Sequence, residues 1–267
     1  MRRLLSIVFV VFASACGQVR VEGSPSGAAS GSTPGFDTSR YPGDDSMRAW
    51  QVPRSPYRWV GYYLQSPCRR DISWTGTRGR LESMGWGLAV VYVGQQAWEA
   101  AGVRADTASL TPPACSRSLL TDARGRADAD DAIARAAAEG FVSGTTIFLD
   151  LERMGAVPDS MRAYYRAWVS RLWTEGRFRP GIYAHRVNAA DLYADIELIR
   201  SASPVRPPAP RWWLAGGSDF SLASAPRDVG FPFANIWQGW LNVRERWGEV
   251  ALDVDVNVSD RASPSAP

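Results

Sequence analysis

The strongest constraint on the fold is an alternation of short apolar runs with segments of helical character. Runs with the length and composition of buried strands occur at 35–39, 59–64, 88–93, 145–152 and 180–184. Between them, 128–139 is rich in Ala and other helix formers, and 159–173 carries aromatic and aliphatic residues at helical spacing. This alternation is typical of parallel βαβ units, and it predicts either a barrel or a doubly wound sheet.

The last third of the chain changes character. The segments 211–215, 235–240 and 251–258 have the pattern of strands, but the Pro- and Gly-rich joins between them are too short or too polar for full helices. The chain has 267 residues, and its total of about eight strands fits a barrel of roughly 200–250 residues that folds as one unit. We therefore predict an α/β fold, a TIM-like (β/α) barrel over 34–260 with reduced helices in its last third.

The N-terminal residues predict export. A basic start, the apolar run 4–12 and the small residues that end at Cys16 form the three parts of a secretory signal peptide at 1–16. The apolar run is shorter than the roughly 20 residues of a membrane-spanning helix. Residues 13–16 also resemble a lipoprotein signal, in which Cys16 carries the lipid; cleavage by an ordinary signal peptidase is the alternative. We expect the mature protein in the periplasm or at the cell surface, either anchored to the membrane through lipidated Cys16 or secreted.

Two segments are predicted to lie outside the barrel. Residues 17–33 are dominated by Gly, Ser, Ala and Pro, a composition typical of a flexible linker. Residues 261–267 have no periodic apolar pattern, and we expect a disordered tail there.

Composition argues against several classes of site. The net charge is +3 and the arginines are dispersed among acidic residues, so no nucleic-acid-binding stripe is expected. His185 is the single histidine, which argues against a zinc site, and no cofactor is predicted. After export, Cys68 and Cys115 remain as a pair in an oxidising compartment, where a disulfide is the expected state. Two unpaired buried cysteines are the alternative.

The sharpest candidate for chemistry is the apolar run that ends in Asp150 and Glu152. Side chains alternate along a strand, so these two carboxylates should project from one face. The carboxyl ends of the strands build the site of a parallel barrel, which favours a functional role. The alternative is structural: one acid caps the following helix and the other pairs with an arginine.

Two more acids occupy comparable positions on the first and last strands. Asp37 lies in the first run, and Asp255 lies in the alternating segment 252–258, whose acids we expect to face the interior of the barrel as a row. First and last strands are neighbours in a closed barrel, so Asp37 and Asp255 should meet. A structural hydrogen bond to the backbone is the alternative for each acid alone.

Five short motifs carry a family resemblance. They are Gly-Phe-Asp-Thr-Ser at 35–39, Phe-Leu-Asp-Leu-Glu at 148–152, Gly-Ile-Tyr-Ala at 181–184, Ile-Trp-Gln at 236–238 and Val-Asp-Val-Asn at 254–257. In this order they resemble family 25 glycoside hydrolases, the barrel lysozymes, and more closely their bacterial relatives in the glycoside-hydrolase-like domain family of unknown function 1906. The resemblance implies a barrel with a polar pocket and peptidoglycan or a related polysaccharide as ligand.

The resemblance also implies roles for the acids. Glu152 matches the general acid, Asp150 the neighbouring carboxylate, and Asp37 and Asp255 the flanking acids; either Asp150 or Asp255 would stabilise the reacting carbon or orient the substrate. The predicted substrate-binding residues are Tyr62, Tyr183, Trp213, Trp237, Gln238 and Asn257, although the aromatic ones could instead fill the core. We thus predict an exported glycoside hydrolase that acts on cell-envelope glycan; the alternative is a non-catalytic glycan-binding protein.

Overall fold

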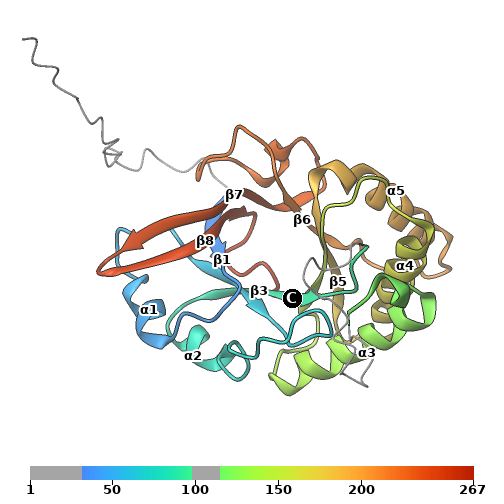
Figure 1. Cartoon of the computed structure of the whole chain (residues 1–267), viewed down its shortest axis with the longest axis horizontal. Coiled ribbons are helices and arrows are strands. Elements are labelled where there is room, and N and C mark those ends of the chain that lie inside the picture. Colours follow the sequence, from blue (N-terminus) through green and yellow to red (C-terminus); the bar gives the residue numbers. More distant parts are fainter. Residues whose placement is uncertain (1–31, 98–114) are drawn as a thin grey trace, which may run out of the picture.

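The computed structural model describes residues 32–97 and 115–267, which form a closed barrel of eight strands in sequence order (Figure 1). The strands are β1 (Thr33–Asp37), β2 (Trp59–Tyr63), β3 (Gly87–Val93), β4 (Thr146–Leu151), β5 (Arg179–His185), β6 (Arg211–Ala215), β7 (Ala234–Trp247) and β8 (Val250–Ser259). The predicted α/β barrel is therefore confirmed. The signal peptide 1–16, with Cys16, and most of the linker 17–33 lie outside the described residues.

The last strand differs from the expectation in its direction. Strands β1 to β7 are parallel to their neighbours, whereas β8 is antiparallel to both β7 and β1. Only Gly248 and Glu249 separate β7 from β8. A connection this short can only return the chain as an antiparallel hairpin, since a parallel neighbour needs a crossover of a dozen or more residues.

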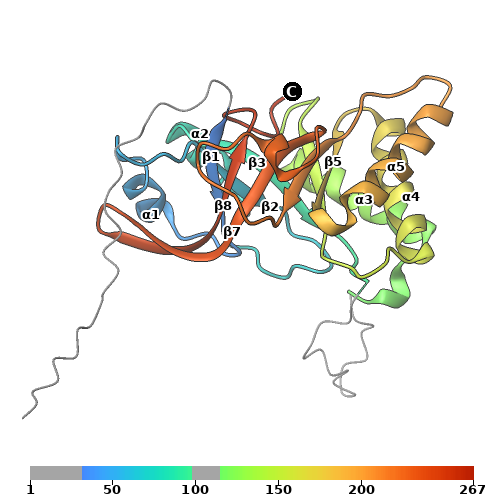
Figure 2. The ribbon, with the colours of Figure 1, turned by 90° about the horizontal axis from the view of Figure 1, so that it is seen from above.

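The long helices cover one side of the barrel. Helices α3 (Asp122–Ala138), α4 (Asp159–Glu175) and α5 (Arg186–Ala202) follow β3, β4 and β5, and they lie together on the right in Figures 1 and 2. Helices α1 (Asp44–Ala49) and α2 (Arg78–Ser83) are single short turns, and only a 3-10 turn, Pro226–Val229, precedes β7. The predicted reduction of late helices is confirmed.

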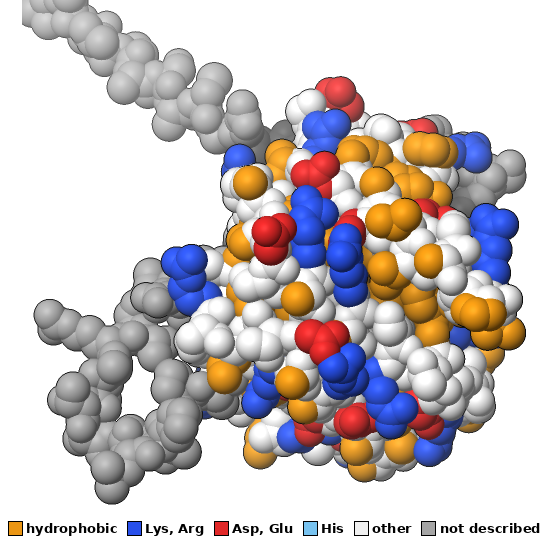
Figure 3. Space-filling model, turned by 90° about the vertical axis from the view of Figure 1, so that its right-hand side faces the viewer, with side chains coloured by type: hydrophobic (Ala, Val, Ile, Leu, Met, Phe, Trp, Pro, Cys, Tyr) orange, Lys and Arg blue, Asp and Glu red, His pale blue; other side chains and the backbone are white. Residues whose placement is uncertain are grey.

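The helical face of the protein carries arginines beside acids, as Figure 3 shows. Representative ion pairs join Arg171 to Asp130 at 2.7 Å and Arg135 to Asp131 at 2.8 Å. Pairing of this kind neutralises the arginines locally and leaves an alternating surface potential on this face.

Strands β7 and β8 extend beyond the barrel as a hairpin arm (Figure 2). The arm rests near α1, where the Trp50 indole N–H donates to the Val250 carbonyl oxygen at 3.1 Å. Asp253 lies in this arm and is exposed, and it pairs with Arg244 at 2.6 Å. The expected row of inward-facing acids is therefore wrong at Asp253, because two register shifts between Gln238 and Val243 separate the arm from the barrel wall.

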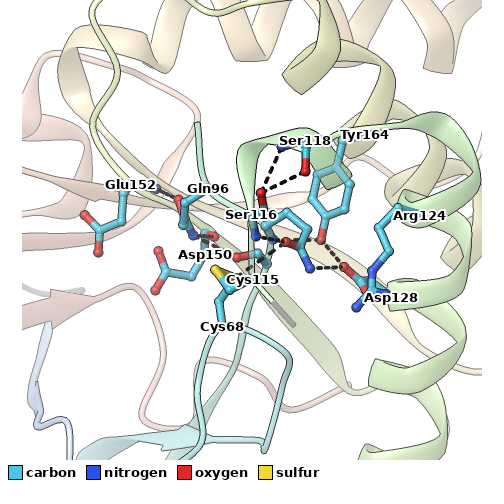
Figure 4. The surroundings of a disulfide bond; sticks show 12 residues. Cys68, Gln96, Cys115, Ser116, Ser118, Arg124, Asp128, Asp150, Glu152 and Tyr164 are labelled. Carbon is cyan, nitrogen blue, oxygen red and sulfur yellow. Dashed lines mark hydrogen bonds and ion pairs between the residues drawn. A yellow bond between two sulfur atoms is a disulfide. The ribbon is translucent and has the colours of Figure 1, made fainter. Parts of the chain in front are cut away.

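The disulfide between Cys68 and Cys115 is present, with 47 residues of separation in the sequence. It joins the loop after β2 to the segment before α3 (Figure 4). Closing a loop of this length restricts the unfolded chain and stabilises a protein by about 2–4 kcal/mol. The bridge thus secures a loop that lies beside the carboxyl ends of β3 and β4.

The C-terminal residues 261–267 are not a disordered tail, in contrast to the expectation. The chain end lies beside β3 (Figure 1), where the Ser265 N–H donates to the Leu88 carbonyl at 2.9 Å and the Thr146 N–H donates to the Ser265 carbonyl at 2.9 Å. The Val90 N–H donates to Ser265 Oγ at 2.7 Å. The first residues of β3 and β4 carry backbone groups that need partners, and the tail supplies them. Local composition could not reveal this role.

Replacing Ser265 with Ala tests the tail. The Val90 N–H would stay buried without a partner, so the free energy of unfolding should fall by about 1–3 kcal/mol. Urea unfolding measures the change. Ser263→Ala is the matched control, because Ser263 Oγ accepts a longer bond of 3.2 Å in a partly exposed place and should cost less. Equal stability of the Ser265 variant and the parent would contradict this account of the tail.

Candidate active site

Four carboxylates gather where strands β1, β4 and β8 meet the mouth of the barrel. Asp37 is the last residue of β1, and Asp255 of β8 is its direct partner in the antiparallel register. Asp150 is the penultimate residue of β4, and Glu152 follows that strand. Figure 4 shows Asp150 and Glu152 projecting to the same side, away from the disulfide. The predicted meeting of Asp37 and Asp255 and the shared direction of the β4 acids are both confirmed.

Asp37 is the hydrogen-bonding hub of this group. It is only 3% exposed. It accepts bonds from the Tyr63 hydroxyl at 2.7 Å, from Gln238 Nε2 at 2.8 Å and from Asn257 Nδ2 at 2.9 Å. Gln238 Nε2 also donates to Asp255 Oδ2 at 3.2 Å, so one amide bridges two carboxylates. Charged groups this deep in a protein persist only with such partners.

Two aromatic donors set the direction of the amides. The Tyr183 hydroxyl donates to Gln238 Oε1 at 2.6 Å, and the Trp213 indole N–H donates to Asn257 Oδ1 at 2.9 Å. Because each amide oxygen accepts from an aromatic donor, each amide nitrogen must face the acids. The structure therefore brings four of the predicted substrate-binding residues together: Tyr183, Trp213, Gln238 and Asn257. Trp213 is 1% exposed and supports the site from below, whereas Tyr183 is partly exposed.

The close approach of β1 and β2 at the site requires a glycine. A Cβ at Gly61 would lie 2.6 Å from the Cβ of Asp37. That separation is far below van der Waals contact, so any side chain there would displace the hub carboxylate.

A bulge in β7 aims a further donor at the site. The register shifts on either side of Trp240, and Asn242 adopts a φ of 52°. Asparagine tolerates this left-handed conformation better than most residues. The bulge directs the Asn242 N–H to Asp255 Oδ1 at 2.6 Å, so both oxygens of Asp255 accept a hydrogen bond.

Asp150 differs from Asp37 and Asp255 because one of its oxygens is free. It is 8% exposed, and its buried Oδ1 has no hydrogen-bond partner among the described residues. Buried polar atoms without partners are rare and are concentrated at functional sites. Glu152 lies at the mouth of the pocket with an exposed side chain, and its backbone N–H donates to Gln96 Oε1 at 3.0 Å.

The pKa values of all four acids are raised. Burial and then the charge of Asp255 raise the pKa of Asp37 to about 7, against the opposing effect of its three donors. Burial, then the charges of Glu152 and Asp37, raise the pKa of Asp150 well above its ordinary value. Partial desolvation and then the charge of Asp255 raise the pKa of Glu152, and desolvation raises that of Asp255. The group thus retains protons at a pH where isolated carboxyls have lost them.

Arginine does not neutralise the carboxylates. None of the ion pairs between described residues includes Asp37, Asp150, Glu152 or Asp255. Arg69 is the nearby cation: its guanidinium lies 4.3 Å from the Tyr63 ring centre and pairs with Asp71 at 3.6 Å. Its charge acts on Asp150 from that position and only partly offsets the rise in the pKa of Asp150.

Tyr62 and Trp237 lie on the outer face of the barrel, contrary to the expectation that they line the cleft. The Tyr62 hydroxyl donates to Glu139 Oε2 at 2.6 Å, and the Trp237 indole donates to the Gly216 carbonyl at 2.7 Å. Side chains alternate along each strand, so the neighbouring residues Tyr63 and Gln238 face the acids instead. We therefore leave Tyr62 and Trp237 out of the site.

Sequence reasoning also missed four residues that the structure adds to the site: Tyr63, Arg69, Gln96 and Asn242. Alternation alone could have found Tyr63, given which face of β2 points inward. Within the described residues no cluster of three or more metal-binding side chains occurs. His185 caps α5, where its Nδ1 accepts the Val187 N–H at 3.2 Å.

The sequence matches a family model described as "Rv2525c-like, glycoside hydrolase-like domain" over residues 48–259. The chain belongs to this family. The resemblance predicted from the five motifs is thereby confirmed, and the structural similarity of this Rv2525c-like domain extends to family 25 lysozymes. Among proteins with curated descriptions, none matches the chain.

Several solved structures share the fold of the Rv2525c-like domain. An uncharacterised protein of B. stearothermophilus is 20% identical, with a TM-score of 0.54 and coverage of 85% of this chain and 96% of that one. The Tat-secreted protein Rv2525c of Mycobacterium tuberculosis, solved with L-tartrate, is 15% identical, with a TM-score of 0.51 and coverage of 85% and 94%. The modular autolysin LytC of Streptococcus pneumoniae is 14% identical, with a TM-score of 0.52 and coverage of 85% and 46%. At these identities the similarity establishes the fold alone.

The raised pKa values predict how stability depends on pH. The folded pKa of each acid exceeds the unfolded value, so the folded state binds more protons and stability falls as pH rises through the folded pKa. Asp150→Asn removes one such group, so the variant should lose less stability between about pH 4 and about pH 8 and be more stable at pH 8 by about 1–3 kcal/mol. Urea unfolding at a series of pH values measures this.

Asp253→Asn is the matched control for this experiment. Asp253 is an exposed aspartate of β8 that is paired with Arg244, and its replacement should leave the pH dependence unchanged. Stability curves of Asp150→Asn and the parent that run parallel across the range would contradict the assignment of Asp150 as a destabilised acid.

Proposed function

We propose that the domain hydrolyses glycosidic bonds of peptidoglycan or a related cell-envelope glycan, with Glu152 as the general acid. The observation that carries the proposal is the pairing of Glu152, whose pKa is raised, with Asp150, whose buried Oδ1 is free of protein partners. Hydrolysis of a glycosidic bond needs one carboxyl group that keeps a proton and a second carboxylate that faces the reacting sugar.

Glu152 suits the acid role because it lies at the mouth of the pocket. Its carboxyl group would donate a proton to the leaving glycosidic oxygen as the bond breaks. Its pKa is raised by desolvation and by the negative charge of Asp255, so more of the group is protonated near neutral pH than in water. After departure of the leaving group, the same carboxylate would accept a proton from the attacking water.

Asp150 suits the second role better than Asp255 does. Both oxygens of Asp255 accept hydrogen bonds from the protein, whereas Oδ1 of Asp150 accepts none from the described residues. An oxygen without a protein partner is available to stabilise the positive charge that develops at the reacting carbon, or to orient a substrate amide that does so. Asp37 and Asp255 would then hold the substrate and supply the negative surroundings that raise the pKa of the acid.

The absence of ion pairs to the four carboxylates within the described residues favours catalysis over a purely structural acid cluster. Partly exposed Tyr183 lies beside Asp150 in the β4–β5 register and offers a ring face and hydroxyl to a sugar. LytC, which shares the fold, has been solved with a synthetic peptidoglycan ligand. Peptidoglycan is therefore the first substrate to test.

Glu152→Gln should lower the release of soluble fragments from purified peptidoglycan by about 10²–10⁴-fold, because general acid catalysis contributes that much. Binding to insoluble peptidoglycan should persist, since the amide keeps the shape of the side chain. Asp253→Asn is the control and should release fragments at the rate of the parent. Fragment release by Glu152→Gln at the parental rate would refute the assignment of the acid. Binding by the parent protein without any fragment release would instead indicate a non-catalytic glycan-binding domain.

We further propose that residues 1–16 direct export and that Cys16 carries a lipid that attaches the mature protein to a membrane. The M. tuberculosis relative Rv2525c is Tat-secreted, which supports export as a property to test. Among the described residues, no helix has the length and apolar character needed to cross a membrane. Attachment would therefore depend on the segment that precedes the barrel.

Cys16→Ser tests the anchor in a bacterial host with lipoprotein processing. The parent protein should partition into the detergent phase of a Triton X-114 extraction, and the variant should move to the aqueous phase, because a lipid chain supplies the apolar area for membrane binding. An aqueous parent protein that has lost its signal peptide would indicate secretion without a lipid.

A further inference from the structure

Two consecutive glutamines follow β3, and both side chains are buried. Gln95 is 0% exposed and Gln96 is 2% exposed. Buried primary amides are costly unless their donors and acceptors are satisfied. Their hydrogen bonds therefore show what each one holds in place.

The side chain of Gln96 bonds to the backbone on both sides of Leu151. Its Nε2 donates to the Asp150 carbonyl at 3.0 Å and to the Gly94 carbonyl at 3.0 Å. Its Oε1 accepts the Glu152 N–H at 3.0 Å. Figure 4 shows these contacts between the disulfide and the two acids.

These bonds replace backbone pairing at the point where it stops. The β3–β4 ladder ends with Val93 opposite Asp150. In a parallel ladder, one residue bonds to the carbonyl before its partner and to the N–H after it. The amide of Gln96 makes both bonds around Leu151, so a side chain takes the place of the missing backbone residue.

We propose that Gln96 is a positioning residue that keeps the Asp150–Glu152 segment extended, so that both carboxylates project into the pocket. Two neighbouring carboxylates repel each other, and the peptide that carries them lies at a strand end where the ladder no longer restrains it. Gln96 supplies this restraint through the backbone and contacts neither carboxylate. The consequence for turnover rests on the proposed function, whereas the consequence for the geometry of the acids does not.

Gln95 provides the matched control. It lies on the opposite side of the chain, where its Oε1 accepts the Ser116 N–H at 3.0 Å and its Nε2 donates to Asp128 at 3.4 Å. These contacts join β3 to the segment after the disulfide and to α3. Removing either amide leaves buried groups without partners, but only Gln96 bonds to the segment that carries the two acids in the contacts described above.

The experiment compares Gln96→Ala and Gln95→Ala with the parent protein by kinetics and by carbon-13 NMR titration of the Glu152 carboxyl. Gln96→Ala should lower kcat for peptidoglycan fragments by about 10- to 100-fold with little change in KM, because misplacement of a catalytic group by about 1 Å costs this much. The pKa of Glu152 should fall toward its ordinary value, since a released segment is better solvated. Gln95→Ala should lower the melting temperature while kcat and the pKa of Glu152 stay at the parental values.

Gln96→Glu is a second variant in case the alanine variant fails to fold. It preserves the volume and the acceptor for the Glu152 N–H, but as a carboxylate it cannot donate to the Asp150 carbonyl, so kcat should again fall. A folded Gln96 variant with parental kcat and a parental Glu152 pKa would overturn the proposal. So would Gln95→Ala if it changed both quantities as much as Gln96→Ala. If the parent protein releases no fragments, the proposed function fails, and the titration alone decides whether Gln96 positions the acids.

Discussion

The site depends on the antiparallel insertion of β8 between β1 and β7. This strand closes the barrel, and its register places Asp255 directly opposite Asp37. It also brings Asn257 within hydrogen-bonding distance of Asp37 and of the Trp213 indole. Without β8 the first strand would be an open edge and Asp37 would lack both a neighbouring charge and one of its donors. Closure of the fold and assembly of the carboxylates are therefore the same event.

The carboxylates are held together at a cost to stability. Burial and mutual repulsion oppose ionisation, and the structure offsets these effects with neutral donors rather than with arginines. Neutral donors keep the acids in place and leave them able to exchange protons, whereas a close arginine would hold a carboxylate permanently ionised. Functional sites commonly retain such unfavourable groups, because the rest of the fold supplies the stability. The disulfide and the ordered C-terminal segment are two such contributions here.

Local pattern predicted much of this organisation. The runs at 59–64, 88–93 and 180–184 correspond to β2, β3 and β5, since apolar runs of this length bury well on both faces of a covered parallel sheet. The helix at 128–139 begins earlier than expected, at Asp122, because the Thr121 side chain caps it by accepting the Arg124 N–H. The C-terminal tail was mispredicted, because its role is to satisfy backbone groups of strands that are remote in sequence.

The sequence by itself determined the strand order, the acids at the strand ends, the cysteine pair and the family. These follow from composition, from period and from motif order, which are properties of short segments. Only the tertiary structure decided which face of each strand points inward, and this is why Tyr63 and Gln238 occupy the site while Tyr62 and Trp237 do not. Alternation divides a strand into two faces without naming the inner one, because in a barrel covered by helices both faces are buried and apolar. The direction of β8 and the bridge from Gln96 likewise depend on contacts between segments far apart in the chain.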